Sequence, residues 1–121
     1  MYSEALLDHF QNPRNVGELP HPAVTVEASN PACGDIMRLS VRFDRDTAAE
    51  ARYKVRGCTA SIAAGSALTE WLVGKSREQL ALFQPSIIVF AVGGLAPESK
   101  HAAVLCADAV KLLLQRLGRG T

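Results

Sequence analysis

The sequence lacks any apolar run near the roughly 18 residues that a membrane-spanning helix needs. It also lacks an excess of charge, because 13 Lys and Arg stand against 12 Asp and Glu, a net charge of +1. A general nucleic-acid binder needs a basic excess, which is missing here. The start, MYSEALLDHF, is an amphipathic pattern with two acidic residues and not a basic, apolar leader. These absences predict a cytoplasmic protein without membrane or nucleic-acid partners.

Cysteine is scarce and its count is odd, with Cys33, Cys58 and Cys106. An odd count without a signal peptide argues against a disulfide framework and favours reduced thiols. The sequence also contains no internal repeat, linker or low-complexity tract. Its 121 residues, 48% of them hydrophobic and 21% charged, therefore predict one soluble domain over 1–121.

Two segments with period-two alternation predict half-buried strands, at residues 37–43 and 51–55. The short DRDT connection between them predicts an antiparallel hairpin. Keeping the apolar faces together requires pairs such as Met37–Val55 and Val41–Ala51. The same register places Cys33 opposite Thr59, next to Cys58, so the two thiols are expected to meet at the open end of the hairpin.

The other regular elements are indicated by caps, apolar stripes and breakers. They are a helix over 4–11 after Ser3, a strand through 24–28, a helix after Cys58 that Thr59 or Ser61 caps and Gly74 ends, a short helix opened by SREQ (76–79) and ended before Pro85, and a helix over 100–117. The segment IIVFAV (87–92) reads equally as a strand or as part of a helix. Whether it lies in the core or on a partner surface stays open.

Two cysteines lie in local settings that favour metal binding or a reactive thiolate. Cys33 is in the turn PACGD, where Gly34 lets the backbone bend and Asp35 follows. Cys58 lies between a strand end and a helix start, where free N–H groups and the helix dipole favour a thiolate. Either cysteine alone is more simply interpreted as a small buried hydrophobe. Two that converge beside Asp35 favour a metal-ligand site.

In the final helix, His101 and Cys106 are five positions apart, about 140° around the axis and about 7.5 Å along it. They cannot bind one ion from a regular helix. Cys106 shares a stripe with apolar residues and is predicted to lie in the core. His101 is near the solvent stripe in the first turn, where it becomes a candidate ligand if that turn lies beside Cys33 and Cys58.

The hairpin should also carry a basic face. Its members are Arg38, Arg42, Arg52, Lys54 and Arg56. A solvated sheet face is the favoured interpretation, and a docking surface for an acidic protein partner is the alternative.

Five motifs follow one another over nearly the whole chain: YSEALLDHFQNPRNVG (2–17), NPACGD (30–35), YKVRGC (53–58), TEWLVGKS (69–76) and KHAAVL with DAV (100–110). Together, in this order, they resemble the IscU/NifU-type iron–sulfur cluster assembly scaffolds. The resemblance implies an α+β fold with a three-stranded antiparallel sheet and helices packed on one face. It also implies a surface site formed by two loops and the start of the last helix.

The functional role that the resemblance implies is that of a scaffold or carrier, not an enzyme. Such scaffolds receive sulfur as persulfide from a cysteine desulfurase, accept iron, and pass a [2Fe–2S] cluster to recipient proteins. By position, Cys33 and Cys58 would be the ligand or persulfide cysteines, Asp35 would tune cluster release and His101 would lie beside the cluster. A monomer or a weak homo-oligomer is expected.

Two positions depart from the family. Ala102 stands directly after the histidine, where the family usually has a third cysteine that accepts sulfur, so the route of sulfur delivery differs or is lost. The segment before the histidine reads LAPES (95–99) and keeps only Leu95 and Pro97 of the family's chaperone-recognition sequence. This difference counts against docking by a dedicated Hsp70-type chaperone.

Two other functions fit the same residues. A zinc-binding sulfur acceptor working with a cysteine desulfurase could use two thiolates, an imidazole and a carboxylate as tetrahedral ligands. A thiol hydrolase using Cys58 or Cys33 with His101 is less favoured, because no orienting group or oxyanion motif accompanies the pair.

Overall fold

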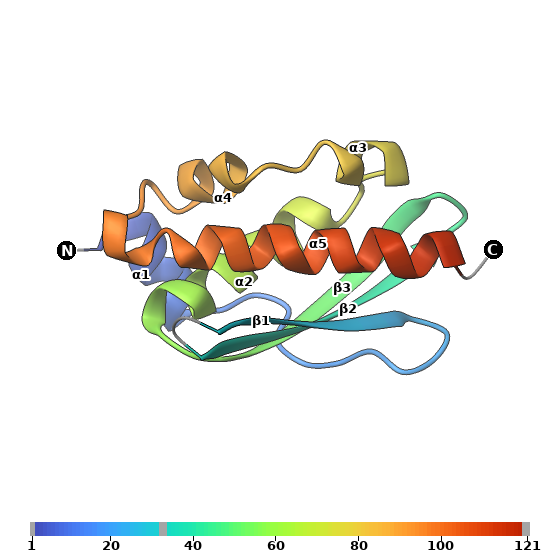
Figure 1. Ribbon diagram of the computed structural model, residues 1–121, viewed down its shortest axis with the longest axis horizontal. Helices are drawn as coiled ribbons and strands as arrows, with labels where there is room; N and C mark the ends of the chain where they lie inside the picture. Colours follow the sequence, from blue (N-terminus) through green and yellow to red (C-terminus); the bar gives the residue numbers. More distant parts are fainter. Residues whose placement is uncertain (1, 32–33, 120–121) are drawn as a thin grey trace.

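The computed structural model describes residues 2–31 and 34–119. Its regular elements are α1 (Glu4–Gln11), β1 (Val24–Asn30), β2 (Asp35–Asp44), β3 (Thr47–Arg56), α2 (Thr59–Leu72), α3 (Arg77–Ala81), α4 (Pro85–Ala91), a 3₁₀ turn (Pro97–Ser99) and α5 (His101–Arg119). The strands form one antiparallel sheet in the order β1-β2-β3. Figure 1 shows the helices on one side of this sheet, with α5 running along it. The predicted fold class is confirmed.

The β2–β3 hairpin has the register that the alternating sequence predicts. Met37 pairs with Val55, and Val41 pairs with Ala51. Beyond Arg42 a bulge shifts the register by one residue, and the strands close through a two-residue turn in which Arg45 has φ 59°. At the opposite, open end of the hairpin, β2 begins at Asp35 and β3 leads into α2.

Helix α2 lies against β3 through a contact that only a glycine permits. A Cβ atom at Gly65 would come within 2.4 Å of the Tyr53 ring. The Tyr53 hydroxyl donates a hydrogen bond to the carbonyl oxygen of Ile62, at 2.7 Å. These two contacts fix the first turns of α2 over the sheet, and with them the position of Cys58.

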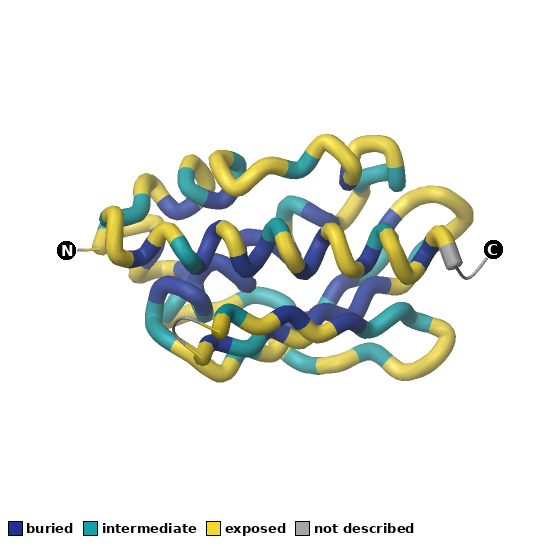
Figure 2. Tube along the Cα trace, in the orientation of Figure 1, coloured by how far each residue is buried: buried dark blue, intermediate teal, exposed yellow. Residues whose placement is uncertain are grey.

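Helix α5 covers the sheet with its apolar stripe, as Figure 2 shows by the buried side of the tube. The stripe is Ala102, Cys106, Ala109, Leu113 and Leu117. Cys106 is completely buried, so its predicted core position is confirmed, and burial raises the pKa of its thiol. Within residues 2–31 and 34–119, no helix is both long enough and apolar enough to cross a membrane.

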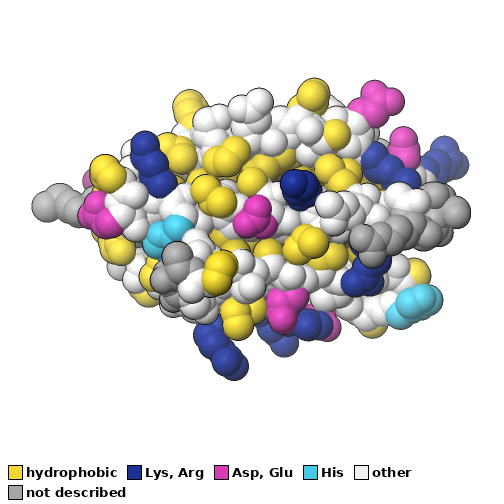
Figure 3. All heavy atoms as spheres, in the orientation of Figure 1, with side chains coloured by type: hydrophobic (Ala, Val, Ile, Leu, Met, Phe, Trp, Pro, Cys, Tyr) yellow, Lys and Arg dark blue, Asp and Glu magenta, His cyan; other side chains and the backbone are white. Residues whose placement is uncertain are grey.

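The segment 87–92, for which the sequence left strand and helix open, is mostly helix α4. Pro85 opens this helix at its first turn, where its missing N–H costs nothing. Ile88 and Val92 are fully buried, whereas Phe90 is 78% exposed. A hollow of about 800 Å³ lies between α4 and α5, and Figure 3 shows hydrophobic side chains gathered there. The segment therefore contributes to both the core and the surface.

Three basic side chains on the outer face of the sheet, Arg38, Arg42 and Arg52, lie beside acidic ones. Arg38 pairs with Glu18 at 3.1 Å and with Glu27 at 3.5 Å. Glu50 pairs with both Arg42 and Arg52. These ion pairs are exposed or half-exposed, which agrees with the favoured interpretation of a solvated face, and each contributes little stability.

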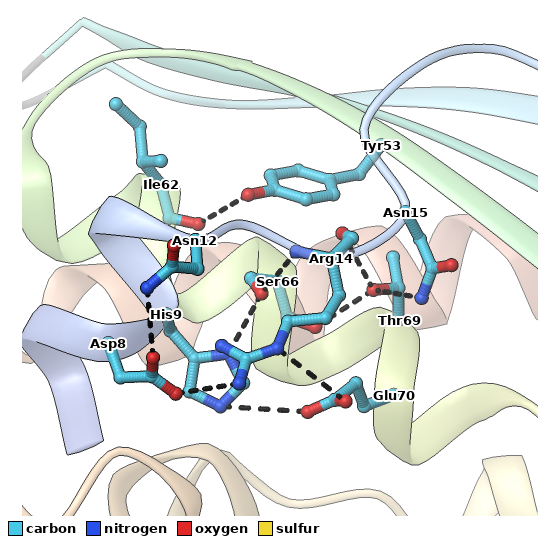
Figure 4. A network of polar contacts seen from close by, with 10 residues as sticks. All are labelled: Asp8, His9, Asn12, Arg14, Asn15, Tyr53, Ile62, Ser66, Thr69 and Glu70. Atoms are coloured by element: carbon cyan, nitrogen blue, oxygen red, sulfur yellow. Dashed lines mark hydrogen bonds and ion pairs between the residues drawn. The ribbon is translucent and has the colours of Figure 1, made fainter.

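A polar network joins α1 and the loop after it to α2 (Figure 4). The His9 ring is buried, with its Nδ1 atom 2.8 Å from the Ser66 hydroxyl and its Nε2 atom 3.7 Å from Glu70. The backbone N–H of Arg14 donates to the same Ser66 oxygen at 2.9 Å, and its guanidinium binds Asp8 at 2.6 Å. Burial and the Arg14 charge lower the pKa of His9, so the neutral ring is the form that the fold favours.

Candidate metal centre

Asp35 begins β2 at the open end of the hairpin, and its carboxylate is almost completely buried. The space that it occupies exists because residue 57 is glycine. A Cβ atom there would lie 2.5 Å from the Asp35 carboxyl carbon. The end of β3 therefore leaves a hollow into which the carboxylate fits.

Cys58 is the N-cap residue of α2, and its half-buried thiol makes no capping bond to the helix backbone. The thiol instead donates a hydrogen bond to Oδ2 of Asp35, at 3.3 Å. This differs from the expectation that Thr59 or Ser61 would cap the helix. Residue 58 has the extended backbone conformation of an N-cap, and the Ser61 hydroxyl turns to Asp35.

His101 begins α5, directly after the 3₁₀ turn and Lys100. Its Nδ1 atom lies 3.1 Å from the carbonyl oxygen of Glu98. Because a carbonyl only accepts, Nδ1 carries a proton, and this contact turns Nε2 toward the site. This Nε2 atom lies 3.4 Å from the Cys58 sulfur and 3.4 Å from Oδ2 of Asp35.

The three side chains thus place a carboxylate oxygen, a sulfur and an imidazole nitrogen within 4.8 Å of one another. These are ligand atoms that zinc and iron accept in proteins. The sequence made His101 a candidate ligand if the first turn of the last helix lay beside the cysteines. That turn does lie beside the Cys58 thiol. Cys33 is outside the described residues, so its predicted meeting with Cys58 stays a prediction.

The Asp35 carboxylate is held in its ionised form. Burial by itself raises its pKa, but the hydrogen bonds from the Ser61 hydroxyl, the Cys58 thiol and the Cys58 backbone N–H, together with the His101 charge, outweigh burial and lower the pKa. An ionised carboxylate at this place also benefits from the dipole at the N-terminus of α2. The site therefore offers an anionic oxygen ligand.

Sequence reasoning missed the role of Ser61, which it treated as a helix cap. The hydroxyl of this fully buried serine lies 2.5 Å from Oδ2 of Asp35 and 3.4 Å from the Cys58 sulfur. Its spacing of three from Cys58 was a signal, because residues i and i+3 share a helix face. What the sequence could not show was which carboxylate that face meets.

A match to a known protein family shows where this chain belongs. The family model of the NifU-like N terminal domain matches residues 1–117. The chain belongs to the NifU-like N-terminal domain family.

Three relatives of this NifU-like chain are named as iron-sulfur cluster assembly scaffold proteins. The iron-sulfur cluster assembly scaffold protein IscU of Haemophilus influenzae is 40% identical over 114 residues, covering 91% of this chain and 90% of that protein. The protein of the same name from Escherichia coli K12 is 37% identical, covering 91% and 88%. IscU 1 of Archaeoglobus fulgidus is 35% identical, covering 92% and 72%.

Solved structures share the fold of the NifU-like chain. A putative iron-sulfur cluster assembly scaffold protein for the SUF system from Fervidobacterium islandicum superposes with a TM-score of 0.76 at 21% identity, covering 93% of this chain and 96% of that one. The N-terminal part of a NifU-like protein from Brucella abortus gives a TM-score of 0.64 at 17% identity, covering 92% and 78%. At these identities the likeness concerns the fold.

Proposed function

We propose that this NifU-like chain is a scaffold on which an iron–sulfur cluster is assembled and from which it passes to recipient proteins. The observation that carries the proposal is the meeting of Asp35, Cys58 and His101, from three elements, with their ligand atoms within 4.8 Å. Relatives named as IscU scaffolds, at 35% to 40% identity, support it. In this role the chain holds iron and sulfide and does not itself catalyse a reaction.

The proposed ligands of iron or of a [2Fe–2S] cluster are Cys33, Cys58 and His101, with Asp35 as the oxygen ligand or the residue that controls release. Mixed thiolate and imidazole ligation suits [2Fe–2S] clusters. Binding requires that the Cys58 thiol lose its proton and that Nε2 of His101 carry none. The contact of Nδ1 with the Glu98 carbonyl keeps a proton on Nδ1 and leaves Nε2 as the nitrogen that faces the site.

Sulfur would arrive from a cysteine desulfurase as a persulfide. The Cys58 thiolate attacks the outer sulfur of that persulfide, a new S–S bond forms to Cys58, and the desulfurase thiolate leaves. Ala102 is fully buried, as is Cys106, so neither position offers a thiol at the surface. Among the described residues, Cys58 is therefore the proposed sulfur acceptor.

A zinc-binding sulfur acceptor is the second candidate function. The observation that favours it is that one oxygen, one sulfur and one nitrogen ligand already converge without Cys33. Three protein ligands with an open fourth position suit a tetrahedral zinc ion. Such a protein would take sulfur on a zinc-bound thiolate and would not assemble a cluster.

Anaerobic reconstitution with iron, cysteine and a cysteine desulfurase tests the proposal. The wild-type chain should acquire iron, sulfide and visible absorption bands of a cluster, and Cys58→Ala and His101→Ala should lose most of each. Cys106→Ala is the matched control, because it removes a cysteine from the core and leaves the site untouched. It should bind as much iron and sulfide as the wild type.

Two outcomes would contradict the scaffold role. The first is a wild-type chain that takes up no iron or sulfide. The second is a cluster that forms equally well in the Cys58→Ala and His101→Ala variants. One zinc per chain in protein purified without added iron, with no cluster after reconstitution, would favour the second candidate function.

A further inference from the structure

Ser61 contacts both the carboxylate and the thiol of the proposed metal site through its hydroxyl. It lies in the first turn of α2, three residues after Cys58, and is fully buried. Its hydroxyl oxygen is 2.5 Å from Oδ2 of Asp35 and 3.4 Å from the Cys58 sulfur. A carboxylate only accepts, so the single hydroxyl proton of Ser61 is donated to Asp35.

Three groups converge on the same Oδ2 atom of Asp35. The Cys58 thiol donates to it at 3.3 Å, the Ser61 hydroxyl donates at 2.5 Å, and the Nε2 atom of His101 lies 3.4 Å away. With a metal ion in place of the thiol proton, the Cys58 sulfur would no longer donate to Oδ2, and Nε2 of His101 would be available to the metal. The Ser61 hydroxyl would then be the side-chain donor that still holds this oxygen.

We propose that Ser61 is a positioning residue that holds the Asp35 carboxylate at the site and thereby sets how tightly the metal is retained. The inference rests on the proposed function, because it assumes that Asp35, Cys58 and His101 bind a metal. Ser61 acts through Asp35, since its proton goes to Oδ2 and not to the metal.

Two effects of the Ser61 hydrogen bond oppose each other. The bond withdraws electron density from the oxygen, which weakens it as a ligand. It also fixes the orientation of the Asp35 carboxylate. Because this carboxylate is almost completely buried, water does not readily replace a lost hydrogen-bond donor. Positioning should outweigh withdrawal, because losing an outer partner of a metal ligand typically lowers affinity about 10- to 100-fold.

The test measures the affinity of the full chain for Co²⁺ and Zn²⁺ by competition with a chromophoric chelator. Ser61→Ala should bind both ions about 10- to 100-fold more weakly than the wild type. The Co²⁺ absorption bands should also shift as the oxygen ligand is displaced. Ser66→Ala is the matched control, because it removes an equally buried hydroxyl from the same helix, where that hydroxyl contacts His9 and Arg14. Its thermal stability should fall, but its metal affinity should equal that of the wild type.

A double-mutant cycle with Asp35→Ala separates positioning from a general loss of stability. If Ser61 acts through Asp35, adding Ser61→Ala to Asp35→Ala should cause no further loss of affinity. Equal affinities of wild type and Ser61→Ala would overturn the inference while leaving the proposed function intact, as would tighter binding by the variant. A wild-type chain that binds neither ion would overturn both.

Discussion

The Nε2 atom of His101 lies 3.4 Å from the Cys58 sulfur, although 43 positions separate the two residues in the chain. The contact joins the first residue of α5 to the N-cap of α2. Asp35, at the start of β2, completes the group. Each ligand atom therefore depends on a different element, and the site forms only when the sheet and both helices are in place.

Gly57→Ala should distort the site, because the added Cβ atom would lie 2.5 Å from the carboxyl carbon of Asp35. We expect the free energy of unfolding to fall by about 1 to 3 kcal/mol, as for other overpacked positions. Metal affinity should fall with it, because the carboxylate moves. Urea unfolding and Co²⁺ titration measure the two effects.

Gly118→Ala is the control for this substitution, because a Cβ atom at that helical position meets nothing within 4 Å. It should leave metal binding unchanged and stabilise the chain by up to about 1 kcal/mol through helix propensity. A Gly57→Ala chain as stable and as tightly metal-binding as the wild type would show that the hollow is not required.

The thiols of Cys58 and Cys106 should differ in reactivity. Cys58 is half-buried, whereas Cys106 is fully buried and its pKa is raised by burial, which disfavours the reactive thiolate. In a Cys33→Ser variant, iodoacetamide should add one group to the folded chain and two groups in denaturant. Mass spectrometry counts the adducts, and two adducts on the folded chain would contradict the buried position of Cys106.

Stability should decrease as the pH falls through the titration range of His9. Burial and then the Arg14 charge lower the pKa of His9 in the folded state, against the smaller opposing effects of Glu70 and Asp8. An unfolded histidine has a pKa of about 6.5, so below that pH the unfolded chain binds more protons than the folded chain. The stabilisation is therefore complete above about pH 6.5 and is lost progressively below it. Urea unfolding at pH 7.5 and 5.5 measures the difference.

His9→Gln should flatten this pH profile, and His21→Gln, at an exposed loop position, should leave it as in the wild type. An unchanged slope in His9→Gln would mean that another group carries the pH dependence.

Asp35 affects stability in a separate pH range. Its pKa is lowered in the fold, so its contribution is present above the unfolded value of about 3.9 and is lost only in stronger acid.

The hairpin was predictable because its register depends on local information. Period-two alternation fixes which residues face the core, and a short turn leaves one register that keeps Met37 opposite Val55. The bulge after Arg42 was not predictable, because the residues on either side of it fit both the regular pairing and the pairing shifted by one residue. Register alone thus placed Cys58 beside the start of β2, where Asp35 lies.

His101 could not be placed from the sequence, because the chain between Val73 and Lys100 carries no pairing signal that orients α5. Segment 87–92 was ambiguous for a related reason. Its β-branched residues suit a strand, yet burial of Ile88 and Val92 stabilises them in a helix, and tertiary packing overrides propensity. Ser61 was missed because a helix-start serine is usually a cap.

The dispersed origin of the three ligand atoms has a thermodynamic consequence. An unfolded chain presents residues 35, 58 and 101 as separate weak ligands, so an ion held at this site binds the native state almost exclusively. Such an ion raises the free energy of unfolding by mass action, by about 2.7 kcal/mol at one hundred times its dissociation constant, and the melting temperature rises with it. Chains that carry the ion would then resist proteases for longer than empty chains. The amount of protein that survives proteolysis would therefore depend on how many chains are loaded.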